Sequence, residues 1–180
     1  MDGMEKLEWI RKHTTEPYDK AKECLITNYH GTKIVTEELL PLLQFSSHGR
    51  VVNVSSHFGL LRVMPWINGK KQILELDLII RPHYFKKNTN PSTWLQFFSG
   101  EELKRDLNNI DSLSEQRLDE LPEFFLKDFK NGQLEPHGWP TEGGYPAYKV
   151  SKALANAYSR IIANKHPELC VNVCIPAMLH

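Results

Sequence analysis

Cysteine is scarce in the sequence, with three residues among 180: Cys24, Cys170 and Cys174. An odd number of cysteines without paired spacing is a poor framework for disulfide bonds. No histidine or cysteine stands at the spacing of a zinc site, so we expect no metal. Free thiols are typical of a reducing compartment, which favours a cytoplasmic protein.

The sequence also lacks an excess of charge of either sign and a long apolar run. Lysine and arginine together number 22, as do aspartate and glutamate, so no basic face for nucleic acid is expected. The longest apolar run, near residues 76–80, is far too short to cross a membrane. Residues 1–13 are polar and charged, unlike a signal peptide. Nucleic acid and membrane are therefore not expected as partners.

What the sequence contains is an alternation of helical and strand-like segments, in a chain of single-domain length. Helical periodicity is found at residues 17–43, 100–130 and 146–166. Two short apolar runs, residues 50–55 and 170–175, have the composition of buried strands. Their order predicts an α/β fold in which helices flank a parallel sheet, with a long helical insertion before the last helix.

One face of the first predicted helix is apolar and is interrupted by an amide. The positions that recur at steps of three and four are Tyr18, Ala21, Leu25, Asn28, Thr32, Val35, Leu39 and Leu42. This stripe is expected to face the core, so the side chain of Asn28 points inward. A buried amide needs hydrogen-bond partners, which makes Asn28 a candidate for the site; the alternative is a packed polar residue bonded to backbone.

The pair Tyr148 and Lys152 has the spacing needed for acid–base chemistry, because side chains four residues apart share one helix face. A phenol normally titrates near pH 10, and an ammonium about 4 Å away favours the phenolate by roughly 1–4 kcal/mol. Such a shift brings a phenol toward the working range of a general acid. Alone, this spacing is common on solvated helices, and Tyr145 with Lys149 forms a second pair. Residues before proline avoid helical geometry, so Pro146 places Tyr145 outside the helix.

Ser56 lies where the first predicted strand ends. Ligands of open parallel sheets bind at the carboxyl ends of the strands, where a hydroxyl could donate a hydrogen bond to a substrate carbonyl. The alternative for Ser56 is a serine that caps a turn. Its position at the strand end makes it a third element of the candidate site.

Four segments occur together in the chain: residues 27–33 (TNYHGTK), 39–43 (LLPLL), 49–56 (GRVVNVSS) and 148–152 (YKVSK). As a set, and in this order, they resemble the classical short-chain dehydrogenases/reductases. The segments LDE and GWP, which precede the last helix, and the long span between Ser56 and Tyr148 resemble the plant monomeric carbonyl-reductase branch of that family.

The resemblance implies a Rossmann-type doubly wound parallel sheet and a monomer that uses NADPH to reduce a small-molecule carbonyl to an alcohol. It implies that Tyr148 protonates the carbonyl oxygen, that Lys152 assists it and holds the nicotinamide ribose, and that Ser56 hydrogen-bonds the carbonyl. Asn28 is expected to organise a water that leads protons to Lys152. Pro176 is expected to lie along the nicotinamide, so Tyr148, Lys152 and Pro176 are the expected cofactor-binding residues.

The chain departs from the family pattern in three places. The Gly-rich turn TGxxxGxG, which holds the cofactor pyrophosphate at a helix N-terminus, is absent from the sequence. The pattern stops shortly after Pro176, before the substrate-binding loop of the family. Residues 66–99 have no counterpart in the family pattern. This segment is either an inserted lobe of the protein or the product of a retained intron or a gene-model error. We therefore interpret residues 1–180 as one domain of this family, truncated at both ends.

Two functions remain open on the sequence alone. The first is an NADPH-dependent carbonyl reductase that uses the Tyr148–Lys152 pair. The second is a catalytically inactive relative that binds no cofactor and acts, if at all, as an interaction protein. The Gly-rich loop discriminates between them, because the family binds the cofactor pyrophosphate there.

Overall fold

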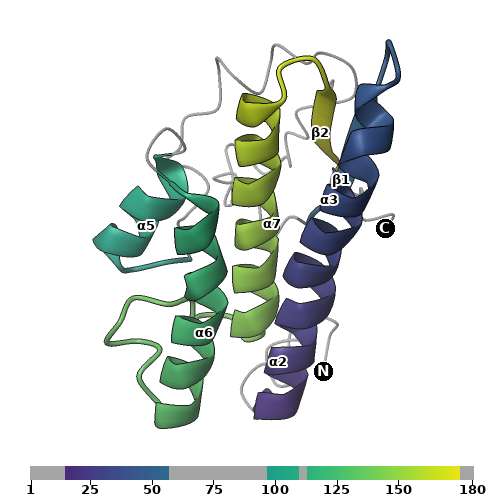
Figure 1. Ribbon diagram of the computed structural model, residues 1–180. Coiled ribbons are helices and arrows are strands. Elements are labelled where there is room, and N and C mark those ends of the chain that lie inside the picture. Colours follow the sequence, from purple (N-terminus) through teal and green to yellow (C-terminus); the bar gives the residue numbers. More distant parts are fainter. Residues whose placement is uncertain (1–14, 57–96, 110–112, 175–180) are drawn as a thin grey trace, which may run out of the picture.

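The computed structural model describes residues 15–56, 97–109 and 113–174. These residues form a layer of helices on a two-stranded sheet (Figure 1). In chain order the elements are helix α2 (Tyr18–Leu25), π-helix η1 (Ile26–His30), helix α3 (Gly31–Gln44), strand β1 (Arg50–Val54), helices α5 (Glu101–Asn108), α6 (Glu115–Asn131) and α7 (Pro146–Lys165), and strand β2 (Cys170–Cys174). All the predicted helical and strand regions contain the expected type of element, so the α/β prediction is confirmed for this part of the chain.

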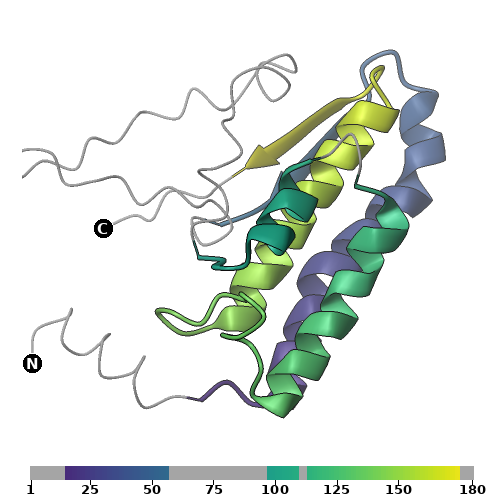
Figure 2. The same ribbon diagram turned by 90° about the vertical axis from the view of Figure 1, so that its left-hand side faces the viewer.

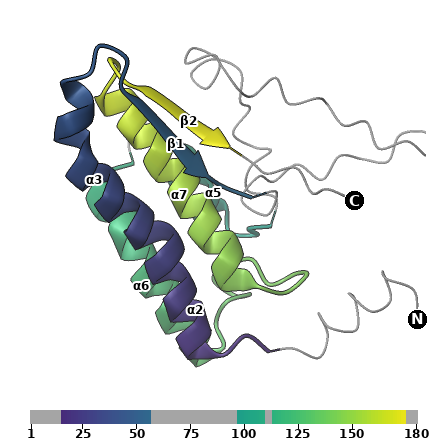
Figure 3. The same ribbon diagram turned by 90° about the vertical axis from the view of Figure 1, so that its right-hand side faces the viewer.

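The two strands pair in parallel, as predicted, with Val51 opposite Val171. Val51 and Val171 are buried, whereas Val52 and Val54 on β1 are 58% and 60% exposed. The prediction of a strand buried on both faces is therefore wrong for β1. The reason is that the described helices lie together on one side of the sheet (Figures 2 and 3). A doubly wound sheet, with helices on both faces, is not seen within the described residues.

Helix α7 is the centre of this part of the fold. It contacts β2 and every other described helix, and Figure 1 shows it between α6 and the rod formed by α2 and α3. Its small buried residues, among them Ala147 and Ala157, leave room for close neighbours on several sides. The helix begins at Pro146, whose ring suits a first helical turn. Burial on most sides fixes the orientation of any side chain that α7 presents at the sheet.

A π-turn in the first rod changes which residues that rod buries. Ala21 and Leu25, before the turn, are buried as predicted. Of the residues predicted to be buried after the turn, Thr32 is half-buried, whereas Val35, Leu39 and Leu42 are largely exposed. Beyond residue 33 the buried or half-buried residues of the rod each lie one position later: Thr36, Leu40 and Leu43. This part of the prediction is wrong because a π-turn bonds i to i+5 and so holds one residue more than an α-turn, which rotates the following face.

Helices α5 and α6 form the helical stretch predicted before α7. Ser114 caps α6, accepting a hydrogen bond of 3.0 Å from the backbone N–H of Arg117. The aromatic rings of Phe98, Phe125 and Trp139 pack in the core beneath these helices. Phe98 belongs to the atypical segment 66–99, and the part of that segment before residue 97 lies outside the described residues.

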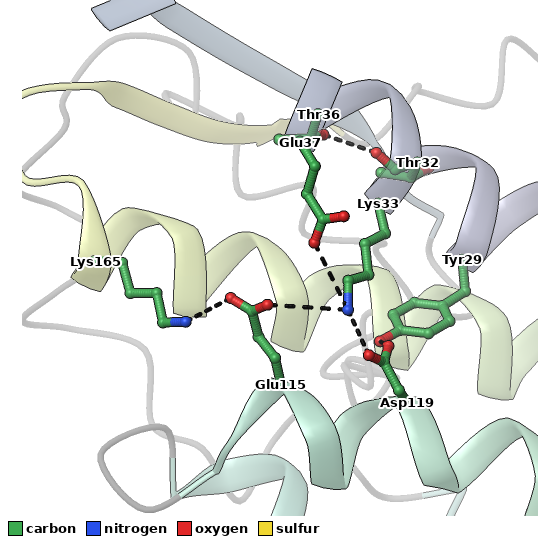
Figure 4. Close-up of polar contacts among 8 residues, drawn as sticks. All are labelled: Tyr29, Thr32, Lys33, Thr36, Glu37, Glu115, Asp119 and Lys165. Carbon is green, nitrogen blue, oxygen red and sulfur yellow. Dashed lines mark hydrogen bonds and ion pairs between the residues drawn. The ribbon is translucent and has the colours of Figure 1, made fainter. Parts of the chain in front are cut away.

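A polar cluster joins α6 to its neighbours (Figure 4). The Tyr29 hydroxyl donates a hydrogen bond of 2.7 Å to one oxygen of Asp119, and the Lys33 ammonium lies 2.5 Å from the other oxygen. Glu115, one turn earlier on α6, pairs with Lys165 of α7 at 2.7 Å. Burial, reinforced by Asp119, raises the pKa of Tyr29, so its hydroxyl stays protonated and acts as a donor. The cluster thus ties α6 to the first rod and to α7.

Replacing Asp119 by alanine is expected to lower the free energy of unfolding by about 1–3 kcal/mol, because it leaves the buried Tyr29 hydroxyl without its acceptor. Urea unfolding followed by circular dichroism measures the change. The matched control is Glu120→Ala, one residue further on α6, where the half-exposed carboxylate pairs with Arg117. That variant is expected to lose under about 1 kcal/mol. Equal losses in the two variants would show that Asp119 has no special role.

Candidate active site

Helix α7 places Tyr148 and Lys152 on one face, one turn apart. The Lys152 ammonium lies 5.6 Å from the centroid of the Tyr148 ring. Tyr145 precedes the helix with a left-handed backbone, φ 52°, so it is outside α7, as the proline at 146 predicted. The two side chains therefore lie close together on one face of α7, as their spacing of four predicted.

The Lys152 ammonium is anchored at the end of the sheet. It donates a hydrogen bond of 3.1 Å to the carbonyl of Val54, the last residue of β1. Burial lowers the pKa of the Lys152 amine, since a half-buried ammonium loses part of its hydration. The bond brings the pair from α7 to the carboxyl end of β1, the edge at which parallel sheets bind ligands.

Ser56 lies two residues beyond Val54, at the same end of β1, and is half-buried. The preceding residue, Ser55, extends the parallel pairing by donating its N–H to the Cys174 carbonyl at 2.8 Å. Ser55 is buried, and its hydroxyl finds no hydrogen-bond partner among the residues described. The carboxyl end of β1 thus carries two serines, of which Ser56 is the more exposed.

Asn28 lies at the middle of the π-turn and contacts α7, so its predicted inward direction agrees with the structure. Its side-chain nitrogen donates to the Ser151 hydroxyl at 3.1 Å and to the Cys24 sulfur at 3.4 Å. The Thr32 hydroxyl donates to the backbone carbonyl of Asn28 at 2.9 Å. The first rod thereby meets α7 one residue before Lys152. The other predicted residue, Pro176, lies outside the described part of the chain.

The two members of the second tyrosine–lysine pair in the sequence differ in burial. Lys149 is only 2% exposed and donates a hydrogen bond to the carbonyl of Glu142, with its ammonium 4.7 Å from the centroid of the Phe97 ring. Tyr145 is 52% exposed. Lys149 therefore braces the loop before α7, whereas Lys152 reaches the end of the sheet.

The sequence prediction missed two residues that contact Asn28. Cys24 stands four residues before it, on the same side of the rod, and Ser151 directly precedes Lys152. The spacing of four between Cys24 and Asn28 could have indicated their contact, because such residues share one helix face. The contact with Ser151 could not be predicted in this way, because it joins distant parts of the chain.

Within the described residues, no three metal-ligating side chains gather. Nor is any helix there long and apolar enough to cross a membrane.

The chain is similar in sequence to plant and animal reductases, although no model of a protein family matches it. Salutaridine reductase from Papaver somniferum is 37% identical over 92% of this chain and 42% of its own length. (+)-Neomenthol dehydrogenase from Capsicum annuum is 35% identical over 88% of this chain and 39% of its own. Carbonyl reductase (NADPH) 3 from Rattus norvegicus is 32% identical over 93% of this chain and 48% of its own.

The fold is similar as well. The solved structure of salutaridine reductase from Papaver somniferum matches with a TM-score of 0.65 and 36% identity, over 94% of this chain and 47% of that one. The chain spans less than half the length of these relatives. It belongs to the short-chain dehydrogenase/reductase family. Within that family it is of the plant salutaridine reductase and neomenthol dehydrogenase type, which confirms the branch indicated by the sequence motifs.

Proposed function

We propose that this chain carries the acid–base part of an NADPH-dependent reductase that converts a small-molecule carbonyl into an alcohol. The observation that carries the proposal is the Tyr148–Lys152 pair, anchored through Lys152 on the Val54 carbonyl at the carboxyl end of β1. The names of two relatives, salutaridine reductase and carbonyl reductase (NADPH) 3, support a reduction as the reaction class. A monomer in the cytoplasm stays a prediction from the sequence.

In this proposal the side chains act on one carbonyl group. Tyr148 donates its phenolic proton to the carbonyl oxygen as that oxygen gains negative charge. The neighbouring Lys152 ammonium favours loss of that proton, because a positive charge stabilises a phenolate. The Ser56 hydroxyl donates a hydrogen bond to the same oxygen and orients it. Asn28 organises a water molecule through which Lys152 is supplied with protons.

The residues present fit one end of the cofactor. An ammonium has three N–H donors, and within the described residues Lys152 uses one of them, on the Val54 carbonyl. The remaining donors suit the hydroxyls of the nicotinamide ribose, which Tyr148 and Pro176 would also approach. NADPH, when bound, supplies the hydride to the carbonyl carbon. The sequence contains no Gly-rich turn to which the pyrophosphate could be assigned.

Titration of the 180-residue chain with NADPH, followed by cofactor fluorescence, tests the proposal. Saturable binding is expected, weakened roughly 10–100-fold by Lys152→Met, because hydrogen bonds from an ammonium would be lost. The matched control is Lys20→Met on α2, where the exposed ammonium pairs with Glu23. It is expected to bind as the unaltered chain does.

A folded chain that binds no NADPH would overturn the proposal. Cooperative urea unfolding establishes whether the chain is folded in the same preparation. That result would favour the second function considered from the sequence, an interaction protein without cofactor. Binding that Lys152→Met leaves unchanged would equally contradict the role given to Lys152.

A further inference from the structure

The Asn28 amide is held by a buried serine that the proposed roles do not use. Ser151 is fully buried on α7, and its hydroxyl donates a hydrogen bond of 2.8 Å to the carbonyl of Tyr148. A serine hydroxyl has a single hydrogen, so this bond leaves Ser151 only lone pairs to offer. The Asn28 nitrogen fills one of them at 3.1 Å.

This arrangement determines which way the Asn28 amide faces. Both atoms beside the amide, the Ser151 oxygen and the Cys24 sulfur at 3.4 Å, accept from its nitrogen. Turning the amide over would require the Ser151 hydroxyl to leave the Tyr148 carbonyl and donate to the amide oxygen instead. The Cys24 sulfur also lies 3.7 Å from the Ser151 oxygen, a contact in which either atom can donate. The amide oxygen therefore points away from these two residues, and it accepts no hydrogen bond from the described part of the chain.

We propose that Ser151 is a positioning residue, whose buried hydroxyl holds the side-chain nitrogen of Asn28 against α7, directly before Lys152. The inference deepens the proposed function and rests on it, because Asn28 matters for catalysis only if the site reduces a carbonyl.

A second serine on the same helix provides a matched control. Ser159 is also buried, donates to the carbonyl of Ala155 at 2.8 Å, and accepts from the side-chain nitrogen of Asn53 at 2.8 Å. The two serines make the same kinds of bond, but Ser159 holds an asparagine on β1 that has no place in the candidate site. Ser151→Ala and Ser159→Ala therefore remove equivalent hydroxyls with different partners.

The test measures hydrogen exchange of the side-chain amides in the ¹⁵N-labelled 180-residue chain by NMR. In Ser151→Ala, the Asn28 side-chain amide is expected to exchange roughly fivefold faster or more, as loss of one hydrogen bond implies. The Asn53 amide is expected to stay unchanged. Ser159→Ala should produce the reverse pattern. Ser151→Thr, which keeps the hydroxyl, should restore slow exchange at Asn28.

An unchanged Asn28 amide in Ser151→Ala would overturn the inference, as would equal acceleration by Ser159→Ala. If Ser151→Ala does not fold, the unaltered chain decides: an Asn28 amide that exchanges as fast as that of the exposed Asn131 overturns the proposal, and slower exchange supports it. The measurement needs no cofactor. A chain that binds no NADPH would therefore contradict the proposed function while leaving the positioning role of Ser151 measurable.

Discussion

Replacing Tyr148 by phenylalanine is expected to lower kcat/KM for NADPH-dependent carbonyl reduction by about 10²–10⁴-fold, the usual contribution of a positioned general acid. The change removes the acidic hydroxyl and keeps the ring beside the Lys152 ammonium, at 5.6 Å in the unaltered chain. Packing and cofactor binding should therefore change little. Initial rates of NADPH consumption, together with the thermal midpoint of unfolding, measure both expectations.

Tyr145→Phe is the matched control for this prediction. Tyr145 stands three residues earlier, outside α7, and is 52% exposed. It belongs to the competing tyrosine–lysine spacing of the sequence, yet its potential partner Lys149 is turned into the core. Removal of its hydroxyl is expected to leave the rate within about twofold of the unaltered chain. A larger loss in Tyr145→Phe than in Tyr148→Phe would contradict the assignment of the general acid to Tyr148.

The features that the sequence predicted well are local ones. Tyr148 and Lys152 lie together because helix geometry alone brings residues four apart onto one face. Pro146 begins the helix that the sequence predicted from this residue, because its ring suits a first helical turn. Such contacts depend on spacing, and spacing is visible in a sequence.

The inward face of the first rod was predicted correctly for Ala21, Leu25 and Asn28, whereas Tyr18 is 39% exposed and the later positions shift. Beyond Asn28, Thr36 is buried in place of Val35, because the π-turn inserts one residue. Nothing in the hydrophobic period reveals such a turn. It coincides with contacts to distant segments, from Asn28 to Ser151 and from Tyr29 to Asp119. A wide turn that costs helix hydrogen-bond geometry is retained where tertiary contacts compensate for it.

The burial of the strands could likewise be predicted from the sequence only in part. A run of valines predicts a strand, and the parallel pairing followed from the order of elements. Which face of β1 is covered depends on where the helices pack. The described helices all lie on one side of the sheet, and Val51 is buried on that side. The exposure of Val52 and Val54 could not be derived from their own composition, since a valine is equally apolar on either side.

Replacing Phe125 by alanine is expected to lower the free energy of unfolding by about 3–5 kcal/mol. Phe125 is fully buried on α6, and its ring lies 5.4 Å from Trp139 in an edge contact and 5.7 Å from Phe129. Removing the ring leaves a cavity that α6, tied down by its ion pairs, can fill only in part. Urea unfolding of the 180-residue chain measures the loss as a lower midpoint at similar slope.

Phe124→Ala is the control one residue away on α6. Its ring is 47% exposed and its packing includes the Arg117 guanidinium, 5.5 Å from the ring centroid. The expected loss is under about 1 kcal/mol, in the range of exposed cation–π contacts. A difference between neighbouring phenylalanines requires that α6 is docked with one fixed face inward. Equal losses would mean that α6 does not hold that face against α7. Helix α7, which carries Lys152, would then lack part of the packing that orients it toward β1.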